Sequence, residues 1–368
     1  MMRSQNGIPD GIPVQKPYDF VPWGVQEPHR TPPTRDGHSV LADGNGGRAG
    51  RVDFTIITKE VVHVGNGRYG FVTVNKDEWL VGMAVGARRW VIVQGNSGGE
   101  AREVSLPVIP GSTLKGVIRS VAEALSGSCA VALGPNTRPS AGRFRPCRRV
   151  DQLCPCCRLF GTTAYAGHFQ VQDVTAADRS AMGVYRMPLL WKPGGGRGLP
   201  ERYRAVGTPG LVGRKFYFHR RHAKGGSDPR LVIKPNVQLS GRILFDNVEL
   251  AELGLLVAAM GCAPGRSFPI KLGAGKPVGM GSVECRIDRV VLFGGARGAD
   301  ASVSPFAGRL GGERHQVFEG EALGELLQRA VQEAMEQNPP LVIPSQLERL
   351  RQIWSPEGLE KEASAGPY

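Results

Sequence analysis

The chain has 368 residues, of which 41% are apolar, so it can bury the core of one large domain or two ordinary ones. A formal net charge of +13 favours an acidic partner such as nucleic acid or an anionic membrane surface, although solubility alone would also account for it. The sequence lacks both the roughly 18–20 consecutive apolar residues of a membrane span and the apolar run of a signal peptide, so we expect a cytoplasmic protein with no membrane partner.

The first confident strand is predicted after a long N-terminal arm. Residues 1–50 are rich in Pro, Gly and Arg, and PYDFVPW at residues 17–23 is their only concentrated aromatic patch. Residues 52–64 then show the β-branched, roughly alternating pattern of a strand. A helix is expected at residues 109–127, capped by Ser112 or Thr113.

The middle of the chain predicts two insertions. A cysteine-rich insertion covers residues 127–166, and a mostly basic loop covers residues 175–230, with a strand at residues 167–174 between them. A second strand follows, up to Phe245.

The second predicted helix is capped by Asp246 or Asn247, runs through Met260 and ends at Gly261. Residues 279–293 return as a strand, and a tail at residues 294–368 contains two amphipathic helices, at 319–337 and 345–354. The sequence leaves open whether these helices dock on the domain or on a neighbour.

In order, these elements give an α+β fold with a β-α-β-β-α-β, ferredoxin-like (RRM-like) core at residues 51–293. Such a core places two helices on one face of an antiparallel sheet and leaves the other face and the insertions available for binding.

Five of the seven cysteines lie between Cys129 and Cys157, a clustering that favours an intracellular zinc site over a disulfide framework. Cys154 and Cys157 form a Cys-x-x-Cys pair, and Cys147 and Cys129 are the natural distant ligands. Four thiols would close the coordination shell, so the predicted role is structural. Cys156 could replace a ligand or remain free.

Two segments have the composition of phosphate sites. In IPGSTLKGVIRS, the helix start with Ser112 and Thr113 offers an anion site, and Lys115 and Arg119 share one helix face. An ordinary capped helix is the alternative. KLGAGKPVGMGSV supplies closely spaced glycines, which let backbone N–H groups approach phosphates, between two lysines. Its candidate residues are Lys271, Gly273, Gly275, Lys276 and Gly279. A flexible hairpin loop is the alternative there.

In GRKFYFHRRH, the cations Arg214 and Lys215 stand beside three aromatic residues, which suits backbone phosphates and stacked bases. An edge strand with a solvated basic face is the alternative reading.

Taken in their order along the chain, over residues 17–290, these motifs resemble the RAMP superfamily. PYDFVPW and GRKFY are similar to segments of one of its branches. The resemblance implies a subunit that grips guide RNA in a type III CRISPR effector complex, packs against other RAMP-type subunits and presents the guide to target RNA.

Two alternatives remain: an endoribonuclease that processes precursor guide RNA with His63 or His219 as general base, and a zinc-stabilised protein adaptor. Active family members also carry a magnesium-dependent aspartate before the Ile-Pro-Gly-Ser turn. Asp77 and then Glu100 are the candidates here, although both also fit solvated loop positions.

Overall fold

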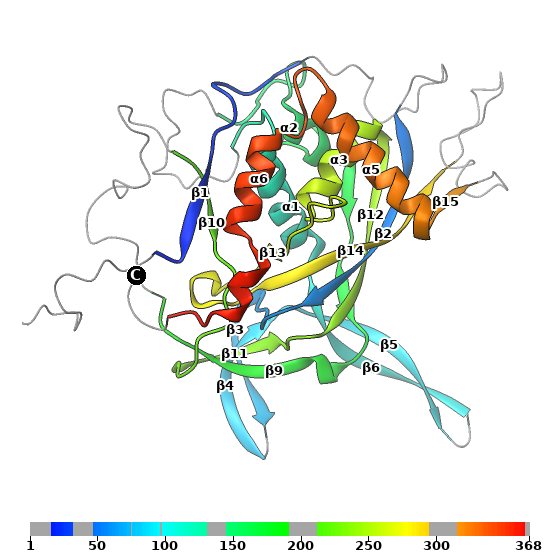
Figure 1. Cartoon of the computed structure of the whole chain (residues 1–368). Coiled ribbons are helices and arrows are strands. Elements are labelled where there is room, and N and C mark those ends of the chain that lie inside the picture. The colour runs from blue at the N-terminus through cyan, green and yellow to red at the C-terminus, as the bar shows by residue number, and fades with distance from the viewer. Residues whose placement is uncertain are drawn as a thin grey trace, which may run out of the picture.

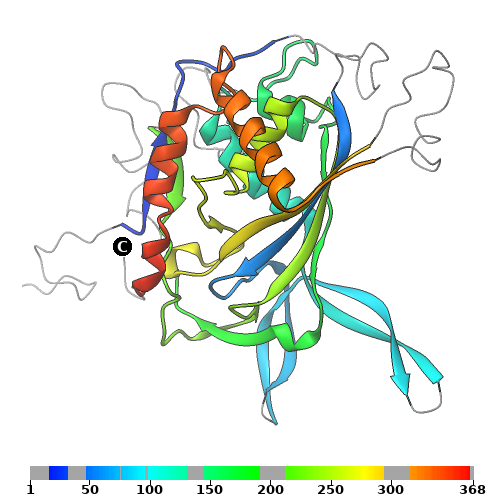
Figure 2. The same cartoon turned by 45° about the vertical axis from the view of Figure 1, so that its right-hand side comes forward.

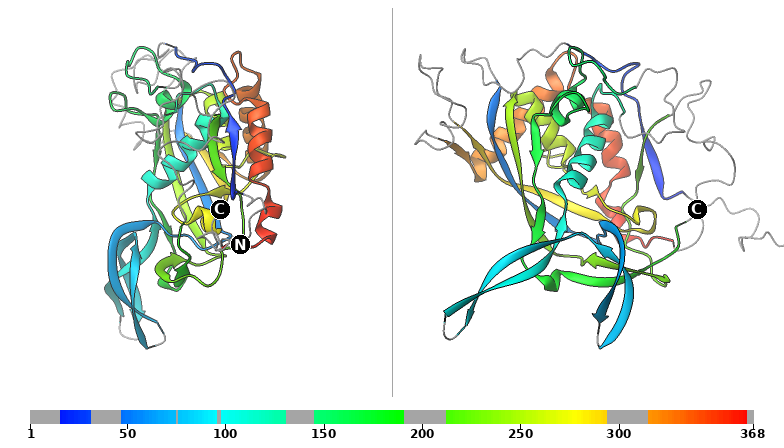
Figure 3. Two further views of the ribbon diagram at one scale, coloured as in Figure 1. Left: turned by 90° about the vertical axis from the view of Figure 1, so that its left-hand side faces the viewer. Right: turned by 180° about the vertical axis from the view of Figure 1, so that it is seen from behind.

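The computed structural model describes residues 16–31, 47–74, 76–95, 98–130, 145–190, 212–293 and 315–364. It shows a mixed α+β protein in which the helices gather at one end and two long hairpins project from the other (Figures 1 and 3).

The largest sheet has nine strands in the order β13-β14-β2-β12-β8-β6-β5, with β15 paired to β14 and β7 paired to β12. Their bounds are β2 (Arg48–Thr58), β5 (Gly86–Gly95), β6 (Gly98–Ile109), β7 (Phe169–Val171), β8 (Val174–Ala176), β12 (Gln238–Val248), β13 (Ile270–Lys271), β14 (Ser282–Leu292) and β15 (Gln316–Phe318). The four strands β14, β2, β12 and β7 pair antiparallel in that order, so residues far apart in the sequence form the centre of the sheet.

Strand β2 forms at the centre because its side chains alternate. Val52, Phe54 and Ile56 are buried in the main hydrophobic core, together with apolar residues of the helices. The alternate residues Arg51 and Asp53 face the other side, where Asp53 accepts hydrogen bonds from arginines of β12 and β14. One face of the sheet is therefore covered by helices and the other is polar.

Five helices pack against the buried face or beside it: α1 (Gly111–Leu125), α2 (Pro155–Phe160), α3 (Leu250–Ala259), α5 (Gly320–Glu336) and α6 (Pro344–Ile353). In α1 the buried residues Leu114, Ile118, Val121 and Leu125 recur at helical spacing and form one apolar stripe. None of the helices in the described ranges combines the length and apolar character that a membrane crossing needs.

The C-terminal helices belong to the core of this domain. The backbones of α3 and α5 approach so closely that a Cβ on Gly254 would lie 2.0 Å from the carbonyl oxygen of Ala330. After α6, the indole of Trp354 donates to the carbonyl oxygen of Tyr217 at 2.9 Å. Of the two positions left open by the sequence, the structure shows the tail docked on its own domain.

Two hairpins fill the segment between β2 and α1. Strand β3 (Gly65–Val74) pairs with β4 (Asp77–Ala84), and β5 pairs with β6. The first hairpin extends into a four-stranded sheet with β11 (Asp228–Ile233) and β9 (Met182–Met187). Figure 2 shows the two hairpins diverging from the body.

Several predicted boundaries were wrong. Neither Ser112 nor Thr113 caps α1, because the helix begins at Gly111 and the N-cap residue is Pro110, whose side chain offers no hydrogen-bond acceptor. The second helix begins after Glu249 rather than at Asp246 or Asn247, because β12 continues to Val248 and Glu249 forms a capping box with Glu252.

The predicted basic loop at residues 175–230 contains strands. β9 and β10 (Gly213–Tyr217) lie within it, although residues 191–211 fall outside the described part of the chain. Strand β10 pairs with β1 (Tyr18–Pro22), the PYDFVP segment of the N-terminal arm. Both are edge strands with a partner about 200 positions away. An edge strand was the alternative reading of GRKFYFHRRH, but Arg214 of β10 is buried rather than solvated.

Candidate functional site

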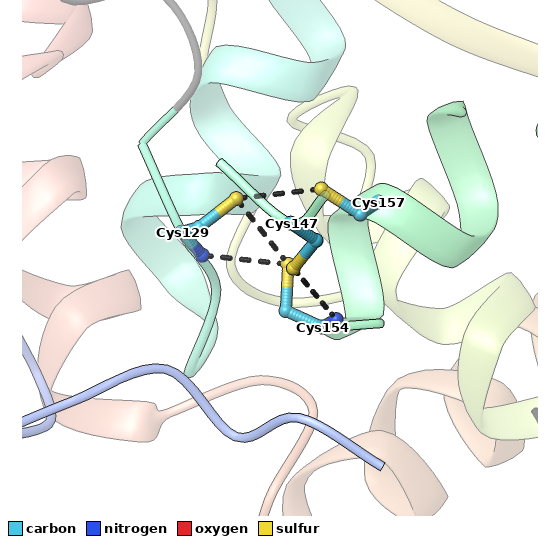
Figure 4. Close-up of side chains that lie close together, drawn as sticks. All are labelled: Cys129, Cys147, Cys154 and Cys157. Carbon is cyan, nitrogen blue, oxygen red and sulfur yellow. Dashed lines mark hydrogen bonds between the residues drawn. The ribbon is translucent and has the colours of Figure 1, made fainter. Parts of the chain in front are cut away.

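Four buried cysteines converge at the end of α1 and the start of α2. Cys129 follows α1, Cys147 comes from the connecting segment, Cys154 is the N-cap of α2, and Cys157 lies within that helix (Figure 4). Their sulfur atoms all lie within 4.8 Å of one another. The four residues predicted as ligands are therefore the four that the fold brings together.

The spacing of the sulfurs fits a tetrahedral zinc ion. Cys129 Sγ lies 3.3 Å from Cys157 Sγ and 3.6 Å from Cys154 Sγ. Zn–S bonds of about 2.3 Å place the sulfurs of a tetrahedral site about 3.8 Å apart. Hydrogen bonds among the four sulfurs lower the pKa of the Cys147 and Cys154 thiols and raise the pKa of the Cys129 and Cys157 thiols, so the four groups are electrostatically linked.

Cys156 takes no part in this cluster. Its Sγ lies 3.7 Å from the hydroxyl of Ser126, and burial raises the pKa of its thiol to about 12. The extra cysteine therefore packs as a neutral thiol behind the four-sulfur group.

A cavity of about 780 Å³ adjoins the cysteine cluster. Helix α1, the segment around Cys147 and the loop at residues 161–167 line it, and its side chains include Lys115, Arg119 and Arg148. The loop is compact because Gly161 has a φ of 90° and a Cβ on Gly167 would lie 2.4 Å from the nitrogen of Gly161. We call this cavity, with its lining residues, the α1 groove.

Two cations in the α1 groove have no counter-ion. Lys115 is half-buried, and burial, followed by the nearby Arg119, lowers its pKa. Arg148 is exposed. Neither side chain has an acidic partner among the described residues, so both are available to an anionic ligand.

Arg119 and Arg214, by contrast, are engaged inside the protein. Glu123 is 2% exposed and lies between them: Arg119 Nε donates to one carboxylate oxygen at 2.8 Å, and Arg214 forms an ion pair with the other. Burial, then the charge of Arg119, lowers the pKa of Arg214 to about 10. The sequence could have indicated the Arg119–Glu123 pair from its spacing of four, but nothing local marks Arg214 as the third member.

The first turn of α1 is partly occupied by an acidic group of the chain. Gly111 N donates to Asp173 Oδ1 at 2.8 Å, and a Cβ on Gly111 would lie 2.2 Å from the carbonyl oxygen of Val171. Ser112 is exposed and Thr113 half-buried beside this contact. The helix start predicted to bind an anion thus already holds one carboxylate, which sequence reasoning missed.

The glycine-rich loop uses its backbone internally. Gly273, Gly275 and Gly279 have positive φ, and the N–H groups of Ala274 and Val278 donate to carbonyl oxygens of His63 and Gly275. The glycines therefore serve the fold of the loop. The positive charges of the loop come from its two lysines, Lys271 and Lys276.

Lys271 is 2% exposed, and its Nζ donates to Gly279 O and Ser282 Oγ at 3.1 Å each. Burial lowers its pKa to about 7 despite the opposing effect of Glu60. The structure therefore places this ammonium inside the loop.

Lys215 and Lys276 approach each other beside the loop. The Lys215 ammonium lies 4.7 Å and 4.5 Å from the ring centroids of Tyr18 and Tyr217. Burial, followed by the charge of Lys276, lowers the pKa of Lys215 to about 8, and burial also lowers that of Lys276. Lys276 is half-buried and has no acidic partner in the described ranges. The two lysines therefore bring two positive charges close together beside the loop.

The histidines proposed as general bases are buried. His219 is fully buried, both of its ring nitrogens are hydrogen-bonded, and burial holds its pKa well below the usual value. His63 is 3% exposed and bonds the carbonyl oxygen of Leu231. His222 is the more accessible imidazole, and its Nδ1 contacts the buried carboxylate of Glu60, a pair that sequence reasoning missed.

The two candidate catalytic acids lie on different hairpins. Asp77 begins β4, is exposed and pairs across the hairpin with Val74. Glu100 lies in β6 and pairs with Val93 of β5, and the Glu100 side chain lies outside the described residues. The two hairpins diverge from each other (Figure 2).

The sequence of this chain matches a known protein family. The sequence profile of the RAMP superfamily matches residues 55–284, which is well over half of the chain and includes α1, the cysteine cluster and the glycine-rich loop. No curated protein matches the chain.

Proposed function

Because the chain belongs to the RAMP superfamily, we propose that it binds guide RNA as a backbone subunit of a type III CRISPR effector complex. Family membership by itself indicates a CRISPR-associated, RNA-binding role. The subunit would hold the guide by phosphate, sugar and shape contacts, present it for pairing with target RNA and pack against other RAMP-type subunits.

A ferredoxin-like core is part of this proposal. The strand order β14-β2-β12-β7 is antiparallel, α1 connects β2 to β7 through insertions, and α3 connects β12 to β14. That order and connectivity suit the β-α-β-β-α-β pattern, with the hairpins and the cysteine-rich segment as insertions.

The observation that carries the proposal is a surface of uncompensated cations beside the family motif. Lys115 and Arg148 line the α1 groove without acidic partners among the described residues. Strand β10 connects this groove to the lysine cluster. Its Arg214 forms an ion pair with Glu123 of α1, and the charge of Lys276 lowers the pKa of the neighbouring Lys215. A polyanion that crosses both would neutralise these cations and restore the lowered lysine pKa values.

Three expected contacts are assigned other roles. We propose that Lys271 holds the glycine-rich loop, that Arg214 neutralises Glu123 and that Arg119 supports the metal site, because their donors are used inside the protein. The cysteine cluster would hold a structural zinc ion, which has four protein ligands and no open position for chemistry.

The two other functions have less support. A histidine-dependent ribonuclease would need an accessible base, and neither His63 nor His219 reaches the surface. A purely protein-binding adaptor would not need uncompensated cations around a groove. Filter binding to single-stranded RNA tests the adaptor, and incubation with repeat RNA tests the processing enzyme.

Replacing Lys115 or Lys276 by glutamine should weaken binding of single-stranded RNA to a similar extent for all sequences. Each lost phosphate contact should also reduce the slope of log K against log salt concentration by roughly 0.7. Filter binding across a salt series measures both. The matched control is Arg329→Gln on the exposed side of α5, which should change neither quantity. An effect confined to particular RNA sequences would contradict backbone binding.

Target cleavage is tested separately, with Asp77 as the first candidate and Glu100 as the second. If Asp77 helps hold magnesium, Asp77→Ala should remove one cut in guide-paired RNA while RNA binding is retained. The assay uses the assembled complex with magnesium and includes Glu100→Ala and Glu78→Ala, the latter an exposed neighbour in β4. An unchanged cutting pattern in the Asp77 and Glu100 variants would make this subunit a non-cutting scaffold.

A further inference from the structure

The Arg119 side chain joins the cysteine cluster to the α1 groove. Its Nη2 donates to Cys157 Sγ at 3.3 Å, its Nη1 donates to the carbonyl oxygen of Gly161 at 2.6 Å, and its Nε donates to Glu123. The planar guanidinium thus reaches a predicted metal ligand, the wall of the groove and a buried acid at once. It also lines the groove itself.

Arg119 has an electrostatic reason to remain there. Four thiolates around a divalent ion leave about two negative charges in a buried site. A cation that donates to a ligand sulfur stabilises that charge and orients the ligand. A second cation lies nearby, because the Arg30 side chain forms a hydrogen bond with Cys147.

Glu123 is held in place independently of Arg119, so it would stay where it is if the Arg119 side chain moved. The second oxygen of Glu123 is held by Arg214, and the carboxylate is 2% exposed. Loss of the metal ion would free Cys157 to move, and Arg119, which donates to its Sγ, would then lose a fixed acceptor. The carbonyl of Gly161, and with it the loop at residues 161–167, then loses a fixed donor.

We propose that Arg119 is a positioning residue that couples metal binding at the four cysteines to RNA binding in the α1 groove. The coupling rests on the proposed function, since it requires RNA in that groove. Metal binding fixes Arg119 and the groove wall, and the fixed groove then presents Lys115 and Arg148 to phosphates. By linkage, RNA binding must in turn strengthen metal binding by the same factor.

The test measures how fast zinc-loaded protein transfers its metal to a coloured chelator, with and without single-stranded RNA. In wild type, RNA should slow the transfer by roughly tenfold, within the usual range of coupling between sites. In Arg119→Gln, transfer without RNA should be about 10–100-fold faster, as for lost partners of metal ligands, and RNA should no longer slow it. Arg119→Lys, which keeps the charge but not the planar fork, should fall between them and carries the test if the glutamine variant does not fold.

Arg148→Gln is the matched control, because Arg148 lines the same groove and, although it follows Cys147 in the chain, its side chain forms no hydrogen bond with the four cysteines in the described structure. It should weaken RNA binding and leave the RNA-free metal transfer at the wild-type rate. Wild-type transfer rates in both Arg119 variants would overturn the positioning role. If zinc-loaded wild type binds RNA and RNA leaves its metal transfer unchanged, the coupling is wrong and the proposed function stands. If it binds no RNA at low salt, the proposed function itself fails.

Discussion

Replacing Glu123 by alanine should lower the free energy of unfolding by about 3–5 kcal/mol, as expected when one partner of a buried ion pair is removed. The variant would leave Arg214 buried with no charge partner from α1, and Arg119 would lose the acceptor of its Nε. Urea denaturation followed by tryptophan fluorescence measures the change.

A control and a rescue make this prediction specific. Glu333→Ala removes an exposed glutamate from α5 and should change the unfolding free energy by less than about 0.5 kcal/mol. Adding Arg214→Met to Glu123→Ala removes the uncompensated charge and should recover part of the loss. If Glu123→Ala and Glu333→Ala have the same unfolding free energy, the ion pairs of Glu123 contribute nothing to stability.

Replacing Cys154 by serine should abolish stable metal binding, whereas the wild-type protein, purified without chelators, should contain about one zinc ion per chain. Structural zinc sites contribute about 10–16 kcal/mol of apparent binding free energy in small peptides, so the described segments 127–130 and 145–166 should lose their fixed structure. The main sheet has its own apolar core and should persist. Elemental analysis and circular dichroism measure the two effects.

The matched control for Cys154 is Cys156, two positions away in the chain. It is equally buried but lies outside the four-sulfur cluster, so Cys156→Ser should retain its zinc ion. A Cys154→Ser variant that keeps a full equivalent of zinc would contradict the ligand assignment, and so would metal-free wild type.

The elements that could be predicted were those with a contiguous signal. The helices α1, α5 and α6 have apolar residues at helical spacing, and the observed bounds differ from the predicted ones by one or two residues. The four cysteines could be grouped because closely spaced thiols, two of them as Cys-x-x-Cys, are typical of a metal site.

The remaining features depend on distant partners. Hairpins β3–β4 and β5–β6 were missed because glycines and charged residues interrupt their alternation, and β10 is fixed by β1, about 200 positions earlier. The sequence shows which residues are charged, but it does not show which charged side chains are exposed. Lys271 and Lys276 look alike in the glycine-rich motif, yet only Lys276 lacks a hydrogen-bond acceptor within the described structure.

The docking of α6 has a consequence for how the chain folds during synthesis. Trp354 packs against Phe216 and Phe268, and Ile343, just before α6, donates to the carbonyl oxygen of Leu125 at the end of α1. Helix α1 and the β1–β10 pair therefore acquire their last neighbours only after the ribosome has passed residue 354. Until then the apolar surface that α6 covers is exposed, so a nascent chain stalled before that point should bind chaperones and be cut more readily by proteases.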